Sequence, residues 1–332
     1  MSKTSFSPGF IEQLAAANHY LREHDDFLVV SHVNPDGDAC SSTYAVGFLL
    51  RQLGKSFTLV NEGTIPEKFQ SIGSGLTVKK LGDLTASASF TYVICVDCAD
   101  YDRIGEVRRI IPDDAQILNI DHHATNDSFG AINALRVDAA STTEVLFDLI
   151  EAMQEPIELE LATCLYTGLL TDTGGFRYAN TSPRVLQIAS KLIAVGVKGS
   201  DLAESFLEII TLPHVELLKR SLNTLTFKRN GQIAWLYVTT TDVAECGASD
   251  EDLEGLVNYP RNITGVEVGL LFKQRDAETV KVSLRSAGKA DVAQIAQTFG
   301  GGGHVRAAGC TIKGTIEQAI ERVVAQVELA LS

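Results

Sequence analysis

The chain has 332 residues, of which 45% are apolar, so it is long enough for two domains that each bury a core. Asp and Glu number 42 and Lys and Arg number 28, which gives a net charge of −14. This charge excludes a broad basic surface that binds long duplex nucleic acid through counterion release, although a short nucleic-acid substrate stays compatible with it. No apolar run reaches the roughly 18 residues of a membrane-spanning helix, and the N-terminus lacks the pattern of a signal peptide, so we expect a cytoplasmic protein with no membrane partner.

Residues 1–183 predict a domain in which short apolar strands alternate with amphipathic helices, the pattern of a parallel α/β sheet. Apolar runs predict the strands of this sheet at 27–32, 57–60, 91–97 and 115–121. Helical spacing of the apolar residues predicts helices at 40–53, 142–153 and 158–171.

The third predicted strand contains Cys95 and Cys98, a C-x-x-C pair that could belong to a redox or zinc site. Their surroundings, YVICVDCAD, form an apolar strand rather than a helix start, and no second C-x-x-C pair completes a zinc site. We therefore expect buried cysteines that pack as small apolar side chains.

Residues 184–213 predict a helical linker, with Pro183 at its start and Pro213 just beyond its helical pattern. The remaining residues, 214–332, predict a smaller α/β domain with a mixed sheet. Two hairpins are expected there, with turns at 229–231 and 275–278. The pattern then becomes helical again, interrupted by four consecutive glycines at 300–303.

Acidic residues and histidines follow the predicted strands of the first domain, where open α/β sheets place their ligand sites. They are His32, Asp36 and Asp38 after the first strand, Asp97 after the third, Asp121, His122 and His123 at the end of the fourth, and Asp172 at the end of a helix. Any one of them alone would more often cap a helix or pack against neighbours. Because clustered carboxylates repel one another, their recurrence at four separate ends predicts a metal site.

The types of ligand narrow the choice of metal. Carboxylates outnumber imidazoles and no thiolate is well placed, which favours a six-coordinate ion such as Mn²⁺ or Mg²⁺, with histidine favouring Mn²⁺. The ligands exceed what one ion can use, so we expect two ions about 3.5–4 Å apart that share a carboxylate and activate a water for attack at phosphorus.

The segments HVNPDGDA, VDCAD, DHH at 121–123 and LLTDTGGF resemble, in this order, the four motifs of the DHH phosphoesterase superfamily. The segment FGGGGHVRAAG at 299–309 resembles the hallmark of the DHH-associated C-terminal domain. Within the superfamily, this two-domain form is similar to the bifunctional oligoribonucleases and 3′-phosphoadenosine-5′-phosphate (pAp) phosphatases, the bacterial nanoRNases. The resemblance implies an active site in a cleft between the two domains, and it suggests a homodimer.

The resemblance also implies a role for each motif residue. Asp97 would bridge two metal ions, with Asp38, His122 and Asp172 completing one site and His32 and Asp36 completing the other. His123 would lie beside the scissile phosphate, to stabilise charge or protonate the leaving oxygen. Asp121 would orient a histidine by a hydrogen bond.

In the second domain, the glycines at 300–303 are expected to precede a helix opened by Arg306, Ala307 and Ala308, so that backbone N–H groups and the helix dipole can meet an anion. Upstream, KVSLRSAGK offers a guanidinium and hydroxyls at a strand end, which suit a terminal phosphate. The resemblance assigns substrate binding to Arg285, Ser286, Gly302, Gly303 and His304.

The function implied is Mn²⁺-dependent hydrolysis of short oligoribonucleotides to mononucleotides and of pAp to AMP. Its partners would be a short single-stranded oligonucleotide or a nucleoside bisphosphate. A phosphodiesterase of cyclic-dinucleotide turnover is the close alternative. The glycine run disfavours an inorganic pyrophosphatase, the chain length disfavours a larger repair exonuclease, and the complete set of motif carboxylates disfavours a binding module without metals.

Overall fold

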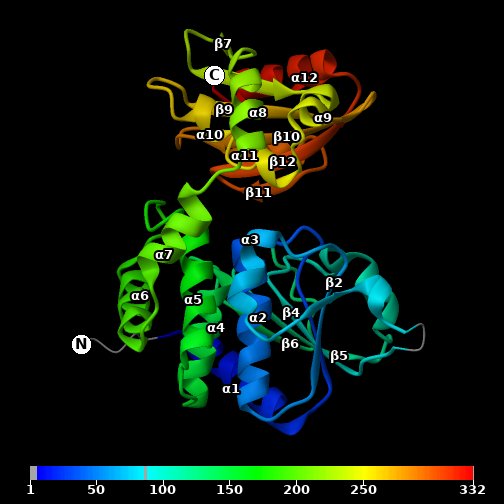
Figure 1. Ribbon diagram of the computed structural model, residues 1–332, viewed down its shortest axis with the longest axis vertical. Coiled ribbons are helices and arrows are strands. Elements are labelled where there is room, and N and C mark those ends of the chain that lie inside the picture. Colours follow the sequence, from blue (N-terminus) through cyan, green and yellow to red (C-terminus); the bar gives the residue numbers. More distant parts are fainter. Residues whose placement is uncertain (1–5, 86–87, 332) are drawn as a thin grey trace. The chain divides into compact units, whose positions relative to one another are not determined.

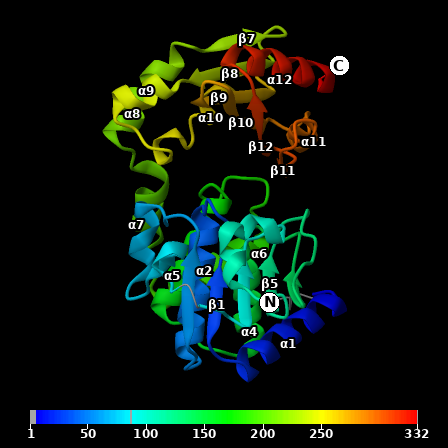
Figure 2. The same ribbon diagram turned by 90° about the vertical axis from the view of Figure 1, so that its right-hand side faces the viewer.

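The computed structural model describes residues 6–85 and 88–331. The chain divides into two compact units between Ile209 and Ile210, and each unit is built on its own six-stranded sheet (Figures 1 and 2). No helix among these described residues is both long and apolar enough to cross a membrane.

The sheet of the first unit has the order β3-β2-β1-β4-β5-β6, and every neighbouring pair is parallel, as predicted. Its strands are β1 (Phe27–Val30), β2 (Phe57–Asn61), β3 (Val78–Lys80), β4 (Tyr92–Val96), β5 (Gln116–Asp121) and β6 (Ile132–Leu135). The four predicted strands are the central ones. The edge strands β3 and β6 were not predicted, because they are short and largely polar or half-exposed.

Helices cover this sheet, which is why its central strands are continuous apolar runs. They are α1 (Pro8–Glu23), α2 (Gly37–Gln52), α3 (Glu67–Gln70), α4 (Thr142–Met153), α5 (Leu159–Asp172), α6 (Pro183–Val195) and α7 (Gly199–Ala203), with 3-10 turns at Ser71–Gly73, Leu81–Asp83 and Tyr101–Ile110 (η3). One apolar cluster joins β1 to α1, α2, α4 and α5, and a second joins the other face of β1 and β4 to η3. Cys95 and Cys98 lie fully buried in the second cluster, as expected of small apolar residues.

The segment 184–213, expected as a helical linker, does not form one continuous helix. Helix α6 ends at Gly196, which has the positive φ that favours glycine, and α7 passes into a π-helical turn, Glu204–Glu208, before Ile209 becomes extended. Val185, Ile188 and Leu192 of α6 are buried in the core of the first unit. This part of the expected linker therefore packs as a helix of the first unit.

The second unit has a mixed sheet with the order β11-β12-β10-β9-β8-β7, in which only β8 and β9 run parallel. Its strands are β7 (Thr226–Lys228), β8 (Ile233–Val238), β9 (Val268–Asp276), β10 (Thr279–Ser286), β11 (Gly302–His304) and β12 (Ala307–Lys313). Its helices are α8 (Leu212–Leu222), α9 (Thr240–Cys246), α10 (Asn258–Arg261), α11 (Val292–Gln297) and α12 (Ile316–Ala330), with a 3-10 turn η5 at Glu251–Leu253.

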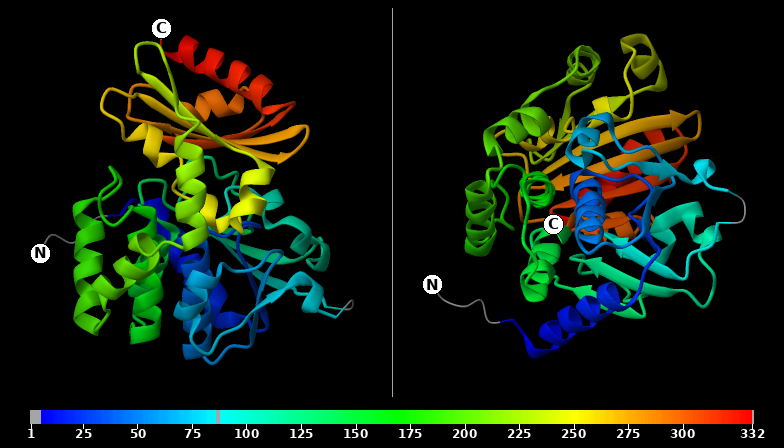
Figure 3. Two further views of the ribbon diagram at one scale, coloured as in Figure 1. Left: turned by 45° about the horizontal axis from the view of Figure 1, so that its top comes forward. Right: turned by 60° about the horizontal axis from the view of Figure 1, so that its bottom comes forward.

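Both predicted hairpins form, β7-β8 and β9-β10. Helices α11 and α12 pack on one face of the sheet, and α8 with η5 packs on the other face over β8 and β9 (Figure 3).

The glycine run does not precede a helix, so that prediction is wrong. Gly302–His304 and Ala307–Lys313 form the antiparallel pair β11-β12. A Cβ on Gly303 would lie 2.5 Å from the carbonyl oxygen of Ala307, and Gly303 has a φ of +141°. The glycines thus let β11 approach β12 closely, and this place has no helix dipole to meet an anion.

Candidate metal centre

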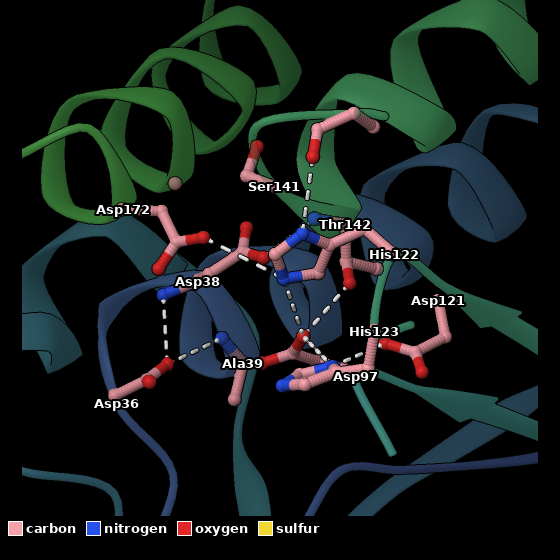
Figure 4. A network of polar contacts seen from close by, with 12 residues as sticks. Asp36, Asp38, Ala39, Asp97, Asp121, His122, His123, Ser141, Thr142 and Asp172 are labelled. Atoms are coloured by element: carbon pink, nitrogen blue, oxygen red, sulfur yellow. Dashed lines mark hydrogen bonds and ion pairs between the residues drawn. The ribbon is translucent and has the colours of Figure 1, made fainter. Parts of the chain in front are cut away.

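The predicted ligands gather at the carboxyl ends of the central strands of the first sheet. The strand order reverses between β1 and β4, the point where open α/β sheets form a ligand crevice. His32 follows β1, Asp97 follows β4, and Asp121 ends β5 with His122 just after it. Figure 4 shows the carboxylates and imidazoles around Asp97 turned toward one another.

Asp97 is the centre of this arrangement. It is 2% exposed and takes a left-handed backbone conformation, with φ +58°, that is uncommon outside glycine. Its Oδ2 lies 3.6 Å from Nε2 of His32, whereas its Oδ1 lies 3.7 Å from Nε2 of His122. The two oxygens of one carboxylate therefore face two different imidazoles, which suits a ligand shared by two metal ions.

The possible metal-ligand atoms around Asp97 form two groups of three residues, which we call trios. His32, Asp36 and Asp97 form one trio, and Asp38, His122 and Asp172 form another, with the ligand atoms of each trio within 4.8 Å of one another. His122 places Nδ1 3.3 Å from the carbonyl oxygen of Ala139, which leaves Nε2 facing Asp97 and Asp172. A third trio adds His123 to Asp97 and His122.

The start of α2 brings Asp36 and Asp38 to this site. Asp36 caps the helix and accepts hydrogen bonds from the backbone N–H groups of Asp38 and Ala39, both at 3.1 Å. A Cβ on Gly37 would lie about 2.5 Å from the side chain of Thr171, so glycine at this position lets α2 approach α5 closely. Asp172, at the end of α5, is thereby held beside Asp38.

The N-terminus of α4 supplies hydrogen-bond donors to two of these carboxylates, and the sequence did not predict these donors. Thr142 donates its backbone N–H to Oδ2 of Asp38 at 2.6 Å and its hydroxyl to Oδ1 of Asp97 at 2.8 Å. Thr143 donates its N–H and its hydroxyl to Oδ1 of Asp38, at 3.2 and 3.0 Å. The only sequence signal was Ser141-Thr142-Thr143 before an apolar run, which reads as an ordinary helix cap.

His123 is held by a separate set of contacts. Its Nδ1 lies 2.8 Å from Oδ1 of the fully buried Asp121, whose other oxygen accepts a 2.6 Å hydrogen bond from Asn126. Against the effect of burial, the hydrogen bond to Asp121 and the charge of Asp97 raise the pKa of His123 to about 9. In the protein without metal, the imidazole is therefore protonated on both nitrogens and positively charged at neutral pH.

The carboxylates of the site do not ionise independently. Burial and the neighbouring Asp97 and Asp36 raise the pKa of Asp38 well above its usual range, and burial with Asp38 and Asp36 does the same for Asp172. For Asp97, burial acts in the same direction, but His32, His123 and His122 together hold its pKa well below its usual range. A divalent cation between these groups would remove the repulsion, so the donor set fits hard metal ions.

The structure places the expected substrate-binding residues of the second unit on one sheet, but not all on one face. Arg285 lies opposite Ala307, which in turn lies opposite His304, so these three share a face. Ser286 is 1% exposed and points to the other face, where its hydroxyl donates to Oε1 of Glu267 at 3.1 Å. Gly302 leaves open space around the position of a Cβ.

The sequence matches two known domains. Residues 26–169 match the DHH family, N-terminal domain, and residues 230–332 match the DHHA1 domain. The bifunctional oligoribonuclease and PAP phosphatase NrnA of Thermus thermophilus is 33% identical over 92% of this chain and 90% of its own length. The chain belongs to the DHH family. Both the α/β fold class and the resemblance inferred from the motifs are thereby confirmed.

Other DHH proteins agree with this placement. NrnA of Bacillus subtilis is 27% identical over 92% of this chain and 94% of its own length. An exopolyphosphatase-related protein from Bacteroides fragilis superimposes with a TM-score of 0.89 at 26% identity, covering 98% of each chain. RecJ of Thermus thermophilus, in complex with Mn²⁺, shares the fold with a TM-score of 0.56 at 14% identity, over 98% of this chain and 55% of its own.

Proposed function

We propose that the protein is a phosphoesterase that hydrolyses short oligoribonucleotides to mononucleotides and converts pAp to AMP. The observation that carries this proposal is Asp97, whose two oxygens face the imidazoles of two neighbouring ligand trios. The DHH relatives that match over nine-tenths of their length are named for both activities, which supports this choice of substrates.

Two Mn²⁺ ions, with Mg²⁺ as the alternative, would be held by His32, Asp36 and Asp97 on one side and by Asp38, His122, Asp172 and Asp97 on the other. Bound there, such ions would supply a nucleophilic water and neutralise charge at phosphorus. RecJ, named as a complex with Mn²⁺, supports the choice of this metal.

The protein's own groups would do the remaining work. His123, protonated and fixed in orientation by Asp121, can donate a hydrogen bond to the phosphate and a proton to the leaving oxygen. Thr142 and Thr143 keep the carboxylates of Asp97 and Asp38 in place. In the second unit, Arg285 and His304 share an exposed sheet face and would hold a substrate phosphate, with Gly302 leaving room for it.

The test compares three substrates with purified full-length protein in Mn²⁺: a 5′-phosphorylated diribonucleotide, pAp and a cyclic dinucleotide. Asp97→Asn is the inactive variant, and Asp102→Asn is its matched control, because Asp102 is 84% exposed and pairs only with Arg108 among the described residues. We expect mononucleotide and AMP release by the wild type and the control, with a loss of at least about 10³-fold in Asp97→Asn.

Two results would decide against the proposal. If only the cyclic dinucleotide is hydrolysed, the protein is instead a phosphodiesterase of cyclic-dinucleotide turnover. The 24% identity to the cyclic-di-AMP phosphodiesterase GdpP of Bacillus subtilis, over 93% of this chain and 48% of that protein, is the reason for including this substrate. No turnover of any of the three by folded, metal-loaded protein would reject the proposed function.

A further inference from the structure

One face of β10 in the second unit carries positive charge. Side chains alternate along this strand: Val280, Val282 and Leu284 are buried in the core under α11 and α12, so the residues between them point to the opposite face. Those residues are Lys281, which is exposed, and the half-exposed Ser283 and Arg285.

The neighbouring strands extend this face on both sides. Lys281 lies opposite Lys273 of β9 and Thr311 of β12, and Arg285 lies in the row of Ala307 and His304. Residues directly opposite one another in an antiparallel pair share a face. We call this set the basic strip: Lys273, Lys281, Ser283, Arg285, Thr311 and His304. From Lys281 to Arg285 it runs four residues, or about 13 Å.

The charges of the strip are unfavourable in the free protein. Two lysines stand directly opposite each other, an arrangement that destabilises a sheet. Lys273 is also half-buried, and burial, Lys281 and Arg275 lower its pKa to about 8. The carboxylate that acts on this pair, Asp250, already forms an ion pair with Arg275. A strip kept only for stability would place an acidic residue opposite one lysine, whereas a bound anion would relieve the repulsion.

A hollow of about 300 Å³ lies at the Lys281 end of the strip. It is lined by Lys281, Thr311, Gly309 and Cys310 and by the segment 299–302, and none of these described lining residues is acidic. At Gly300 and Gly302 no atom lies within 4 Å of the position a Cβ would take, so the backbone there is open to a ligand. The hollow therefore combines an ammonium group, a hydroxyl and accessible backbone.

We propose that this hollow is a nucleotide subsite that binds a further phosphate of a single-stranded oligonucleotide, beyond the phosphate assigned to Arg285 and His304. Lys281 and Thr311 contact that phosphate. This inference rests on the proposed function and deepens it, because it makes the second unit sensitive to substrate length. A 5′-phosphorylated dinucleotide and pAp carry only two phosphates, the scissile one and the one assigned to Arg285 and His304, whereas a tetranucleotide has further phosphates for the hollow.

The experiment measures kcat and KM of the full-length protein in Mn²⁺ for pAp, a diribonucleotide and a tetraribonucleotide. Lys281→Ala is the test variant, and Lys281→Arg keeps the charge. Lys228→Ala is the matched control, because Lys228 is an exposed lysine at the opposite edge of the same sheet, paired with Glu328 at 2.8 Å. Thermal unfolding of each variant shows that the fold is retained.

For Lys281→Ala we expect KM for the tetranucleotide to rise about five- to tenfold with kcat unchanged. The slope of log KM against log salt concentration should become smaller by about 0.7, which is the contribution of one phosphate contact in a single strand. In Lys281→Ala, kcat and KM for pAp and the dinucleotide should stay within about twofold of the wild-type values. Lys281→Arg should bring KM for the tetranucleotide back to the wild-type value, and Lys228→Ala should have wild-type kcat and KM for all three substrates.

An equal effect on all three substrates would overturn the subsite, because Lys281 would then act on the phosphate common to all of them. No effect on any substrate would overturn it as well. In both cases the wild type still hydrolyses its substrates, so the proposed function stands. If the wild type cleaves none of them, the proposed function itself fails.

Discussion

The metal centre of the first unit and the basic strip of the second unit concentrate opposite charges by different means. In the metal centre, the carboxylates of Asp38 and Asp97 are buried and are held by hydrogen bonds from Thr142 and Thr143 without a metal ion. On the strip, the exposed Lys281 of β10 stands directly opposite the half-buried Lys273 of β9. Each region is unfavourable alone and would be relieved by a ligand of opposite charge.

The two regions differ in how exactly their side chains have to be placed. Metal ions demand ligand atoms at fixed distances, so the first unit places them on strand ends and helix starts and fixes them with a further layer of donors. A nucleic-acid backbone is flexible, so a row of cations spaced along a strand is sufficient. Substitutions should therefore cost far more in the first region than in the second.

The largest effect is expected for Asp172→Asn, which removes one ligand of the trio with Asp38 and His122. Activity should fall about 10³-fold. Because the folded state raises the pKa of Asp172, its ionised form destabilises the metal-free protein above the ordinary pKa of an aspartate. The variant should therefore be more stable than the wild type without metal, yet gain less from Mn²⁺ in thermal unfolding. Lower metal-free stability at pH 7 would contradict this account.

Thr142→Val is expected to act on metal affinity. The substitution keeps the backbone N–H bound to Asp38 and removes only the hydroxyl that donates to Asp97. Mn²⁺ affinity measured by calorimetry should fall about 10- to 100-fold, as for other groups that orient ligands. Thr163→Val, which removes an exposed hydroxyl bonded to the carbonyl of Leu159, is the control. Unchanged affinity in Thr142→Val would show that this hydroxyl has no such role.

Asp121→Asn should shift the pH dependence of catalysis. In the folded protein, His123 has a pKa raised to about 9, so its proton is retained at neutral pH and lost as the pH rises through that value. Without the Asp121 carboxylate, the pKa of His123 should fall by about one unit or more. The alkaline limb of the kcat profile should move to lower pH by the same amount, with little change near pH 6. A parallel loss at every pH would indicate misplacement of the ring instead.

The smallest effects are expected in the glycine run, where neighbouring residues should behave differently. A Cβ on Gly301 would lie 2.2 Å from the carbonyl oxygen of Gly309, so Gly301→Ala should lower the free energy of unfolding by about 1–3 kcal/mol. Gly302→Ala should change it by less than about 0.5 kcal/mol and raise KM severalfold, because its methyl group enters the space left for substrate. Denaturant unfolding measures the change in stability and steady-state kinetics measures KM. If both variants lose the same stability and have the same KM, there is no argument for a substrate at Gly302.

The central strands of the first sheet, and the gathering of acidic residues and histidines at their carboxyl ends, could be predicted from the sequence because their signals are local. Buried parallel strands are apolar runs, and the residues that follow them meet at one sheet edge. Thr142 and Thr143 could not be predicted, since their partner Asp38 lies about a hundred residues earlier and is reached only when α4 packs against α2.

Two further failures have physical causes as well. Gly300–Gly303 fit either a helix start or a close strand pair, and only the contact with Ala307 and Gly309 distinguishes them. The amphipathic pattern of α6 shows that it buries one face, but it does not show that this face belongs to the first unit. Local signals thus predicted elements, while contacts between distant segments decided their roles.

The most direct test of the shared carboxylate is a Mn²⁺ titration of the metal-stripped full-length protein, followed by calorimetry and electron paramagnetic resonance. We expect two Mn²⁺ ions per chain with a spin-coupled signal, and in Asp97→Asn the loss of the coupling together with at most one tightly bound ion. A single uncoupled ion in the wild type, or a coupled pair that survives in Asp97→Asn, would contradict it.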